Sequence, residues 1–259
     1  MHPFIEIFGL QIGTYSIFAL IGFFSGAVVV LLRRKKYPLA PFDILALFGV
    51  IIVGVIVGSK ILYIITRLPG IIKNFGYLFT DFQKFSDAYF GGMVFYGGLI
   101  GAAVAAFGYC RYMKVDFSQV CLLFVPIIPL IHGIARIGCF FAGCCYGIHT
   151  PAPWGVAFTH SLGAPNGVTL LPVQLYEAAL NLIIFAALML YTRKPRNVKN
   201  VLAIYMVSYG IVRFVLEFFR GDAIRGVFMG ISTSQVISLI LIAGGLFLVF
   251  AAQKREKVV

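Results

Sequence analysis

The stretch HGIARIGCFFAGCCYG, residues 132–147, predicts both the class of fold and the position of a polar site. It begins at the end of an apolar run long enough to enter a bilayer, and it carries Arg136 into that run. It then becomes a glycine-punctuated loop that holds three of the five cysteines. An arginine near hydrocarbon persists only where it faces an interior or a wet cavity and meets an anionic partner. His132, Arg136 and Cys139 are spaced by four and three residues, which places them on one face of a helix.

The composition is that of an all-α polytopic membrane protein. Hydrophobic residues make up 61% of the 259 residues and charged residues 12%, whereas a soluble domain is about a quarter charged. The net charge of +12 comes from basic residues in short segments between apolar runs, a pattern that indicates membrane topology and argues against a nucleic-acid partner. The first run is too long for the core of a signal peptide and its basic residues follow it, so we expect it to remain as a span.

Seven apolar runs are long enough to cross a bilayer, which takes about 17–25 residues each. We expect spans near residues 13–32, 43–67, 92–110, 119–137, 172–191, 200–219 and 232–252. Lys and Arg gather in alternate connecting segments, at 33–36, 111–114, 193–199 and 254–257. Because cytoplasmic segments carry this excess, the sequence predicts a single membrane domain over residues 1–259, with its N-terminus outside and its C-terminus in the cytoplasm.

Two outer segments have compositions suited to the membrane surface. Residues 68–90 are rich in Phe and Tyr, which fits an amphipathic element lying on the membrane. Residues 138–171 contain no Asp, Glu, Lys or Arg. We expect this second segment to lie at the outer interface, with Trp154 at the depth of the lipid headgroups.

A second charged anomaly occurs in the sixth span. Tyr209, Arg213 and Glu217 recur every four residues, and Arg220 follows one turn later. An Arg213–Glu217 ion pair that only holds the helices together is one interpretation. Arg136, however, has no carboxylate within a turn of its own helix. Two guanidiniums suit forked hydrogen bonding to a phosphate, and a phospholipid headgroup supplies a phosphate at that depth.

Two further stretches carry polar or small residues at helical spacing. Gly97 and Gly101 are spaced by four, which suits close helix packing, although glycines also let a backbone donate to a ligand. Pro172 marks the start of the fifth span, and Gln174 and Glu177 share a face of it. We place Glu177 in the first turn, where the helix dipole offsets part of the cost of its charge and a capping role is the structural alternative.

The run 132–147 resembles the signature of the prolipoprotein diacylglyceryl transferase family. Four further blocks look similar and occur in the family's order: residues 91–101, 172–177 and 209–220, and Gln235. The resemblance implies a bacterial cytoplasmic (inner) membrane enzyme of lipoprotein biosynthesis whose active site faces the outer leaflet. It would transfer the diacylglyceryl group of phosphatidylglycerol to the lipobox cysteine of a prolipoprotein, form a thioether and release glycerol phosphate. The implied partners are these two substrates and membrane lipids, and no cofactor or nucleic acid is expected.

The resemblance assigns roles to residues by position, with Arg136 and Arg213 matching the family's essential arginines. We expect catalytic roles for Arg136, Arg213, Tyr96, Tyr209 and Glu217. We expect substrate binding by Tyr15, Gly97, Gly98, His132, Cys139, Cys144, Gly147, Gln174, Glu177 and Arg220. No metal ion is expected.

The chain departs from the family pattern at three positions. Tyr96 stands where the family has a histidine, a candidate for thiol activation, and a tyrosine with a pKa near 10 is a poor base. His132 and His149 are substitutes, with structural hydrogen bonding as the favoured role for each.

The other two departures are Cys139, in place of an asparagine, and Cys144, in place of a glutamate. With Cys145 they admit a soft-metal site, a redox pair, or simple packing, of which we favour packing. The alternative function is a divergent paralogue that binds, transports or modifies another lipid or a small thiol.

Overall fold

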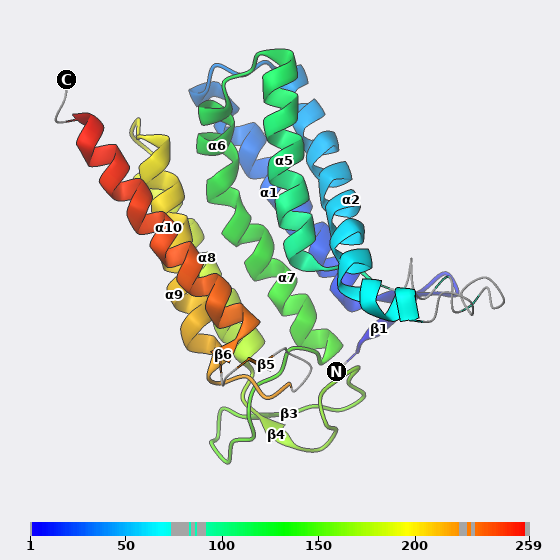
Figure 1. The fold of residues 1–259 in the computed structure, drawn as a ribbon. Helices are drawn as coiled ribbons and strands as arrows, with labels where there is room; N and C mark the ends of the chain where they lie inside the picture. Colours follow the sequence, from blue (N-terminus) through cyan, green and yellow to red (C-terminus); the bar gives the residue numbers. More distant parts are fainter. Residues whose placement is uncertain are drawn as a thin grey trace. The chain divides into compact units, whose positions relative to one another are not determined.

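The computed structural model describes residues 2–73, 83, 86, 92–222, 227–228 and 231–256. It divides into two compact units. The terminal unit comprises Met1–Lys36 and Cys121–Val259, and the middle unit comprises Tyr37–Val120. Each unit is described by itself below, and Figure 1 labels their helices and strands.

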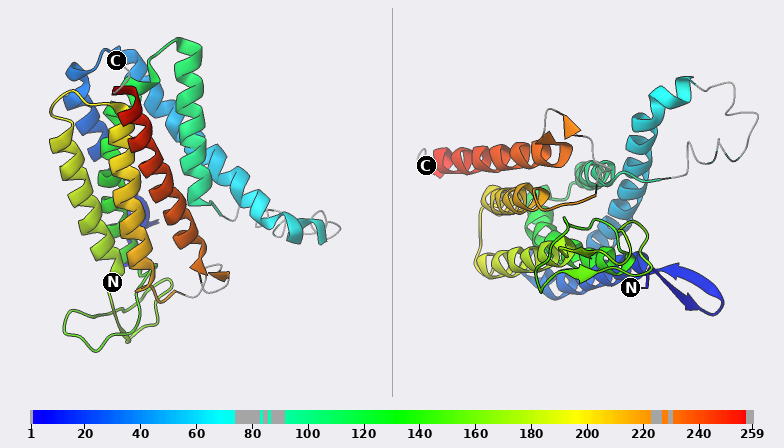
Figure 2. Two further views of the ribbon diagram at one scale, coloured as in Figure 1. Left: turned by 60° about the vertical axis from the view of Figure 1, so that its left-hand side comes forward. Right: turned by 90° about the horizontal axis from the view of Figure 1, so that it is seen from below.

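The terminal unit consists of helices and short antiparallel hairpins. Its helices are α1 (Thr14–Arg33), α6 (Phe117–Phe124, which begins in the middle unit), α7 (Ile128–Ala142), α8 (Val173–Tyr191), α9 (Val198–Glu217) and α10 (Thr233–Glu256), with 3-10 turns at Arg34–Lys36 and Val125–Ile127. Its antiparallel hairpins pair β1 (Phe4–Ile7) with β2 (Leu10–Gly13), β3 (Val156–Ala157) with β4 (Thr169–Leu170), and β5 (Val227–Phe228) with β6 (Ile231–Ser232). The helices pack in the sequence α1, α7, α8, α9, α10, as Figure 2 also shows.

Six helical segments among the described residues are long and apolar enough to cross a membrane. They are Thr14–Lys36, Pro41–Lys73, Phe117–Ala142, Val173–Tyr191, Val198–Glu217 and Thr233–Gln253. Many of their large apolar side chains are exposed, for example Leu20, Phe24 and Phe247, as expected of helices surrounded by lipid. The prediction of a polytopic helical membrane protein is confirmed at this level. The third predicted span, 92–110, coincides with helix α5 (Phe95–Met113), which is not one of the six.

Small residues let α1 and α7 approach closely. A Cβ atom added at Gly22 would lie 3.0 Å from the carbonyl oxygen of Ile131, and one at Gly138 would lie 2.8 Å from the Cβ of Phe18. Close approach of this kind is the usual way for helices to pack where water provides no hydrophobic drive. It brings the start of α1, with Tyr15, against the end of α7.

The terminal unit has a basic end. Arg33 donates to Thr192 Oγ1 at 2.8 Å and to the carbonyl of Leu123 at 3.4 Å, and Lys36 donates to the carbonyl of Arg193 at 3.0 Å. These bonds join the end of α1 to the α8–α9 connection. The opposite ends of α7, α8 and α9 meet at the turn that follows α7, where Gln174 donates to the carbonyl of Cys144 and Gly147 forms a β-bridge with Arg220.

The middle unit contains α2 (Pro41–Lys73) and α5, which pack as an antiparallel pair. Gly54 faces Gly101, and Gly58 faces Gly97, so closely that a Cβ on either member would overlap the partner's backbone. The structure therefore supports the packing role for Gly97 directly. Of the predicted surface segment 68–90, residues 68–73 continue α2. The rest of that segment, apart from Gln83 and Ser86, lies outside the described residues.

We expect opposite stability effects from alanine at two glycines of α5. In Gly101→Ala the added Cβ meets the backbone of Gly54 and Gly58, so the two helices must separate at a cost of roughly 1–3 kcal/mol. In Gly108→Ala the Cβ meets nothing within 4 Å, and removing a helical glycine stabilises by roughly 0.5–1 kcal/mol. The midpoint of thermal unfolding in detergent should fall for the first variant and hold or rise for the second. Equal shifts would contradict this packing.

Candidate functional site

A buried carboxylate lies between two arginines near the ends of three helices, opposite the basic end of the terminal unit. Glu177 of α8 is 1% exposed. Its Oε1 lies 3.0 Å from Nη2 of Arg136 on α7, and its Oε2 lies 3.8 Å from Nη1 of Arg213 on α9. The partner that Arg136 lacks on its own helix therefore comes from α8.

Each arginine has a further partner. Arg213 Nη2 lies 2.7 Å from Glu217 Oε2 and donates to Ser234 Oγ of α10 at 2.8 Å. Arg136 Nε donates to His132 Nε2 at 3.2 Å. The same Nε2 atom of His132 lies 3.6 Å from Glu177 Oε1.

Two cations and two carboxylates balance in this cluster, which is the condition for keeping charge out of water. Some polar atoms are nevertheless left over. Within the described part of the chain, Arg213 Nη1 and Gln174 Oε1 are buried and have no hydrogen-bond partner, and Arg213 Nη1 faces Glu177 Oε2 only at the longer distance of 3.8 Å. Buried polar groups are normally satisfied, so exceptions call for an explanation. Here the Nη1 donor of Arg213 is suited to an anionic oxygen.

Two tyrosines lie beside this cluster. The Tyr209 ring is centred 5.3 Å from the His132 ring and stacks on Tyr205 at 5.9 Å. Tyr15 is exposed on α1. It interacts electrostatically with Arg136 and with the three cysteines that follow Arg136 in the sequence.

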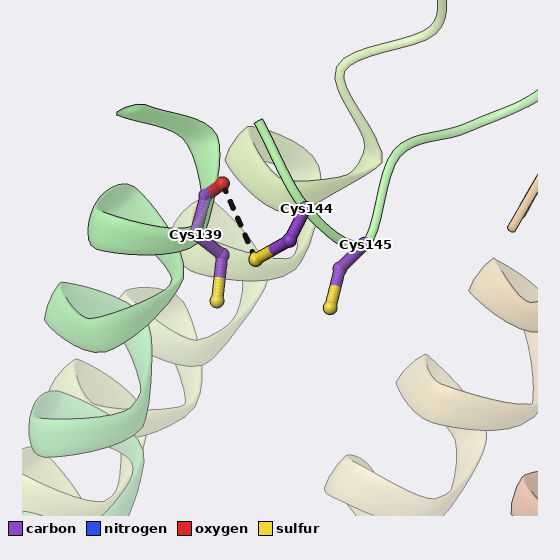
Figure 3. Close-up of side chains that lie close together, drawn as sticks. All are labelled: Cys139, Cys144 and Cys145. Carbon is purple, nitrogen blue, oxygen red and sulfur yellow. Dashed lines mark hydrogen bonds between the residues drawn. The ribbon is translucent and has the colours of Figure 1, made fainter. Parts of the chain in front are cut away.

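The three cysteines converge at a turn, residues 139–145, which we call the thiol turn. Gly143 adopts a left-handed conformation (φ 69°) that ends α7 and sends the chain back, so that the amide of Cys144 donates to the carbonyl of Cys139 at 3.1 Å. Cys145 is also left-handed (φ 61°), which is uncommon for a residue other than glycine. The Sγ atoms of Cys139, Cys144 and Cys145 all lie within 4.8 Å of one another. Figure 3 shows them pointing into one small space, with the Cys144 thiol also reaching the carbonyl of Cys139 at 3.7 Å.

Surrounding segments hold the thiol turn in place. Gln174 Nε2 donates to the carbonyl of Cys144 at 2.7 Å. The amide of Leu162 donates to Ala142 at 3.0 Å, and that of Ala164 donates to Gly143 at 2.9 Å. The turn is therefore fixed from α8 on one side and from the following loop on the other.

Of the predicted outer segment 138–171, residues 138–142 belong to α7, and the loop that follows has a small core of its own. Phe158, Ala164 and Leu170 are buried together, and Phe140 packs against them. Trp154 is 62% exposed. A folded loop without formal charge that presents a tryptophan outward is consistent with a place at the membrane surface.

Arg220 borders the thiol turn. Its side chain makes two hydrogen bonds to Asp222, at 3.1 and 2.8 Å, and its backbone pairs with Gly147. Hydrogen bonds from the Cys139 and Cys144 thiols lower the pKa of the Cys145 thiol, and the guanidiniums of Arg136 and Arg220 lower it further, against the opposing effect of burial. The two guanidiniums thus favour the thiolate form of Cys145, whereas hydrogen bonding to Cys139 and Cys145, together with burial, raises the pKa of the Cys144 thiol.

The structure brings most of the predicted site residues together in the terminal unit. They are Tyr15, His132, Arg136, Cys139, Cys144, Gly147, Gln174, Glu177, Tyr209, Arg213, Glu217 and Arg220. Tyr96, Gly97 and Gly98 belong to the middle unit, and their membership of the site stays a prediction.

One detail of the sequence analysis was wrong. Glu177 is not in the first turn of α8, which holds no acidic residue, so the arginines compensate its charge in place of the helix dipole. Sequence reasoning also missed Ser234, Asp222 and Asn181. Asn181 donates to the carbonyl of Glu177 at 2.8 Å, and its spacing of four residues from Glu177 was the available signal.

Comparison with known proteins agrees with this arrangement. The sequence model of the family described as prolipoprotein diacylglyceryl transferase matches residues 3–251. The chain belongs to the prolipoprotein diacylglyceryl transferase family. Among its relatives in this family, the phosphatidylglycerol–prolipoprotein diacylglyceryl transferase of Clostridium tetani is 37% identical over 93% of this chain and 94% of the relative.

Other members of the family are nearly as similar. Transferase 2 of Clostridium perfringens is 32% identical over 94% of this chain and 92% of its own length, and the Nitrosomonas europaea enzyme is 32% identical over 99% and 93%. The resemblance seen in the sequence motifs is therefore confirmed over nearly the whole chain.

We expect Glu177→Gln to destabilise the protein strongly. Removing this carboxylate leaves two buried guanidiniums without their shared anion, and breaking a buried pair from one side costs about 3–5 kcal/mol. The midpoint of thermal unfolding in detergent should fall clearly, while the matched change Glu6→Gln, at an exposed position of β1, should leave it unchanged. A negligible shift for Glu177→Gln would show that the two arginines do not depend on it.

Proposed function

We propose that this chain transfers the diacylglyceryl group of phosphatidylglycerol to the lipobox cysteine thiol of a prolipoprotein, forming a thioether and releasing glycerol phosphate. The observation that carries the proposal is the pair of guanidiniums, Arg136 and Arg213, held on either side of the buried Glu177. Membership of the family over residues 3–251, and the names of relatives that align over nearly the whole chain, supply the reaction.

In the proposed topology the chain crosses the bacterial cytoplasmic membrane seven times as one domain, with α5 as the third span, its N-terminus outside and its C-terminus inside. The hydrogen-bonded basic end of the terminal unit, with Arg33 and Lys36, supports this orientation because cytoplasmic ends are rich in Lys and Arg. The arginine cluster at the opposite end then faces the outer leaflet.

The reaction requires positive charge at the departing phosphate. Attack by a thiolate on the glycerol carbon leaves a phosphate monoester with an additional negative charge. Fixed cations that already face the phosphate stabilise this charge without reorganising. Arg213 Nη1, which is buried and has no hydrogen-bond partner among the described residues, and the guanidinium of Arg136 are the donors for this role.

The remaining groups have supporting roles in this proposal. Glu177 and Glu217 orient the guanidiniums, and Tyr209 covers His132. The loop after α7, residues 143–171, with its exposed Trp154, controls access of the lipid and the signal peptide from the outer interface.

We expect cells depleted of their own transferase to recover lipidated prolipoprotein when they express this chain. Arg136→Ala and Arg213→Ala should abolish the recovery. Arg136→Lys should lose about tenfold to a hundredfold in rate, since an ammonium cannot replace the forked donor. The control is Arg196→Ala, an exposed arginine at the basic end, which should retain full activity.

The product identifies the reaction in the purified system. Protein in bilayers of phosphatidylglycerol, incubated with a lipobox peptide, should add one diacylglyceryl group to the peptide thiol, as measured by mass spectrometry. Bilayers of phosphatidylethanolamine test the choice of donor. A stable membrane protein that binds phosphatidylglycerol but gives no thioether would instead support the alternative of a paralogue with another lipid or thiol.

A further inference from the structure

We propose that the thiol turn binds a zinc ion through Cys139, Cys144 and Cys145, and that the acceptor thiol of the substrate occupies the fourth coordination position. This inference deepens the proposed function, on which its second half rests. It assigns the activation of the thiol, which the family histidine cannot provide where this chain has Tyr96.

The geometry of the three sulfurs suits zinc. Zinc binds thiolate sulfur at about 2.3 Å with tetrahedral geometry, which places the sulfurs of one site about 3.8 Å apart. The three Sγ atoms already lie within 4.8 Å of one another. Rotation of the thiol side chains by a small amount closes this difference. Soft thiolate ligands select zinc and copper(I) over harder ions.

The backbone is organised around this arrangement. Two left-handed residues in three positions, Gly143 and Cys145, fold the chain so that thiols from a helix and from the turn meet. A residue other than glycine in this conformation costs roughly 1–2 kcal/mol, and such strain persists where the surroundings enforce it, often at functional sites. Here the hydrogen bond from Gln174 to the carbonyl of Cys144 is one of the contacts that enforce it.

The surrounding charge favours an anionic metal centre. Zinc with three thiolates carries a net charge of −1, and a fourth thiolate makes it −2. Arg136, three residues before Cys139 on α7, and Arg220, whose backbone pairs with Gly147, place positive charge beside the thiol turn.

The site has an open side. Cys139 is buried, whereas Cys144 and Cys145 are partly exposed. Among the described residues the cluster contains only the three cysteines and no histidine or carboxylate as a fourth ligand. Three protein ligands with a free position are the pattern of catalytic zinc, whereas structural zinc has four. Because α7 carries both Arg136 and Cys139 three residues apart, the fourth position lies near the group that binds the phosphate.

The chemistry balances without an oxidant or reductant. The acceptor thiol binds zinc and releases its proton to water, because a coordinated thiol is deprotonated. The zinc-bound sulfur then attacks the glycerol carbon, so that a C–S bond forms and the C–O bond breaks. The electron pair of that bond leaves with the phosphate oxygen as glycerol phosphate. The product thioether is a neutral and weaker ligand, and it leaves the metal.

The metal content of the purified protein tests whether the thiol turn binds zinc. The full-length protein, purified in detergent under reducing conditions, should retain about one zinc ion per chain by elemental analysis. Cys139→Ser, Cys144→Ser and Cys145→Ser should each lose it, whereas Cys121→Ser, at a buried cysteine outside the cluster, should not. Three results would overturn the assignment. The protein could stay metal-free after zinc loading, it could hold copper in place of zinc, or mass spectrometry could find a disulfide among these thiols.

Substitution of zinc by cobalt tests whether the acceptor thiol occupies the fourth coordination position, without measuring turnover. The Co²⁺-loaded protein should show thiolate-to-cobalt charge-transfer absorption, which should grow by about a third when a lipobox peptide adds a fourth sulfur. A matched peptide with serine in place of the cysteine should produce no change. Equal spectra with both peptides would overturn the fourth-ligand role.

Activity separates failure of this inference from failure of the proposed function. Zinc-free protein should form no thioether, and added zinc should restore it. If the zinc-free protein transfers the diacylglyceryl group at the full rate, the zinc inference is wrong and the transferase function stands. If the Co²⁺-loaded protein responds to the lipobox peptide but the zinc-loaded protein forms no thioether, the transferase function is wrong and the thiol-binding metal site stands.

Discussion

The contact on which the site depends is the buried carboxylate of Glu177 between two arginines. In hydrocarbon neither guanidinium can lose its proton, so each needs an anion nearby. Glu177 lies 3.0 Å from Arg136 and 3.8 Å from Arg213, and it thereby ties α7 and α9 to α8. The same contact sets the spacing of the two cations that we assign to the lipid phosphate. The packing of these three helices and the binding of the phosphate thus both depend on Glu177.

Close helix packing brings the rest of the site to this carboxylate. Gly22 and Gly138 seat α1 against α7, which places Tyr15 beside the end of α7. Gly147 and Gly221 allow the backbone after α9 to run against the thiol turn, since a Cβ at either would meet neighbouring backbone at 2.5 Å. The arginine cluster and the cysteines are therefore parts of one continuous structure. That continuity is why a metal at the thiol turn would act on the same reaction.

Spacing along the helices was sufficient to find Arg136, Arg213 and Glu217, because residues three or four apart share a face whatever the tertiary structure. The same argument misjudged Glu177. Its position near the start of α8 suggested that the helix dipole compensates its charge, whereas the arginines that pair with it lie on other helices. For the cysteines it favoured packing, because nothing in the local sequence shows that Cys145 takes a left-handed conformation.

The sequence by itself determined that this is a helical membrane protein of the prolipoprotein diacylglyceryl transferase family with two intramembrane arginines. Hydropathy and motif spacing are local properties of the sequence, so they can be recognised without a structure. Only the tertiary structure decided that Glu177 is the common partner of both arginines and that three thiols meet in one space. These contacts join residues from different helices and from a strained turn, and such pairings depend on how the helices pack.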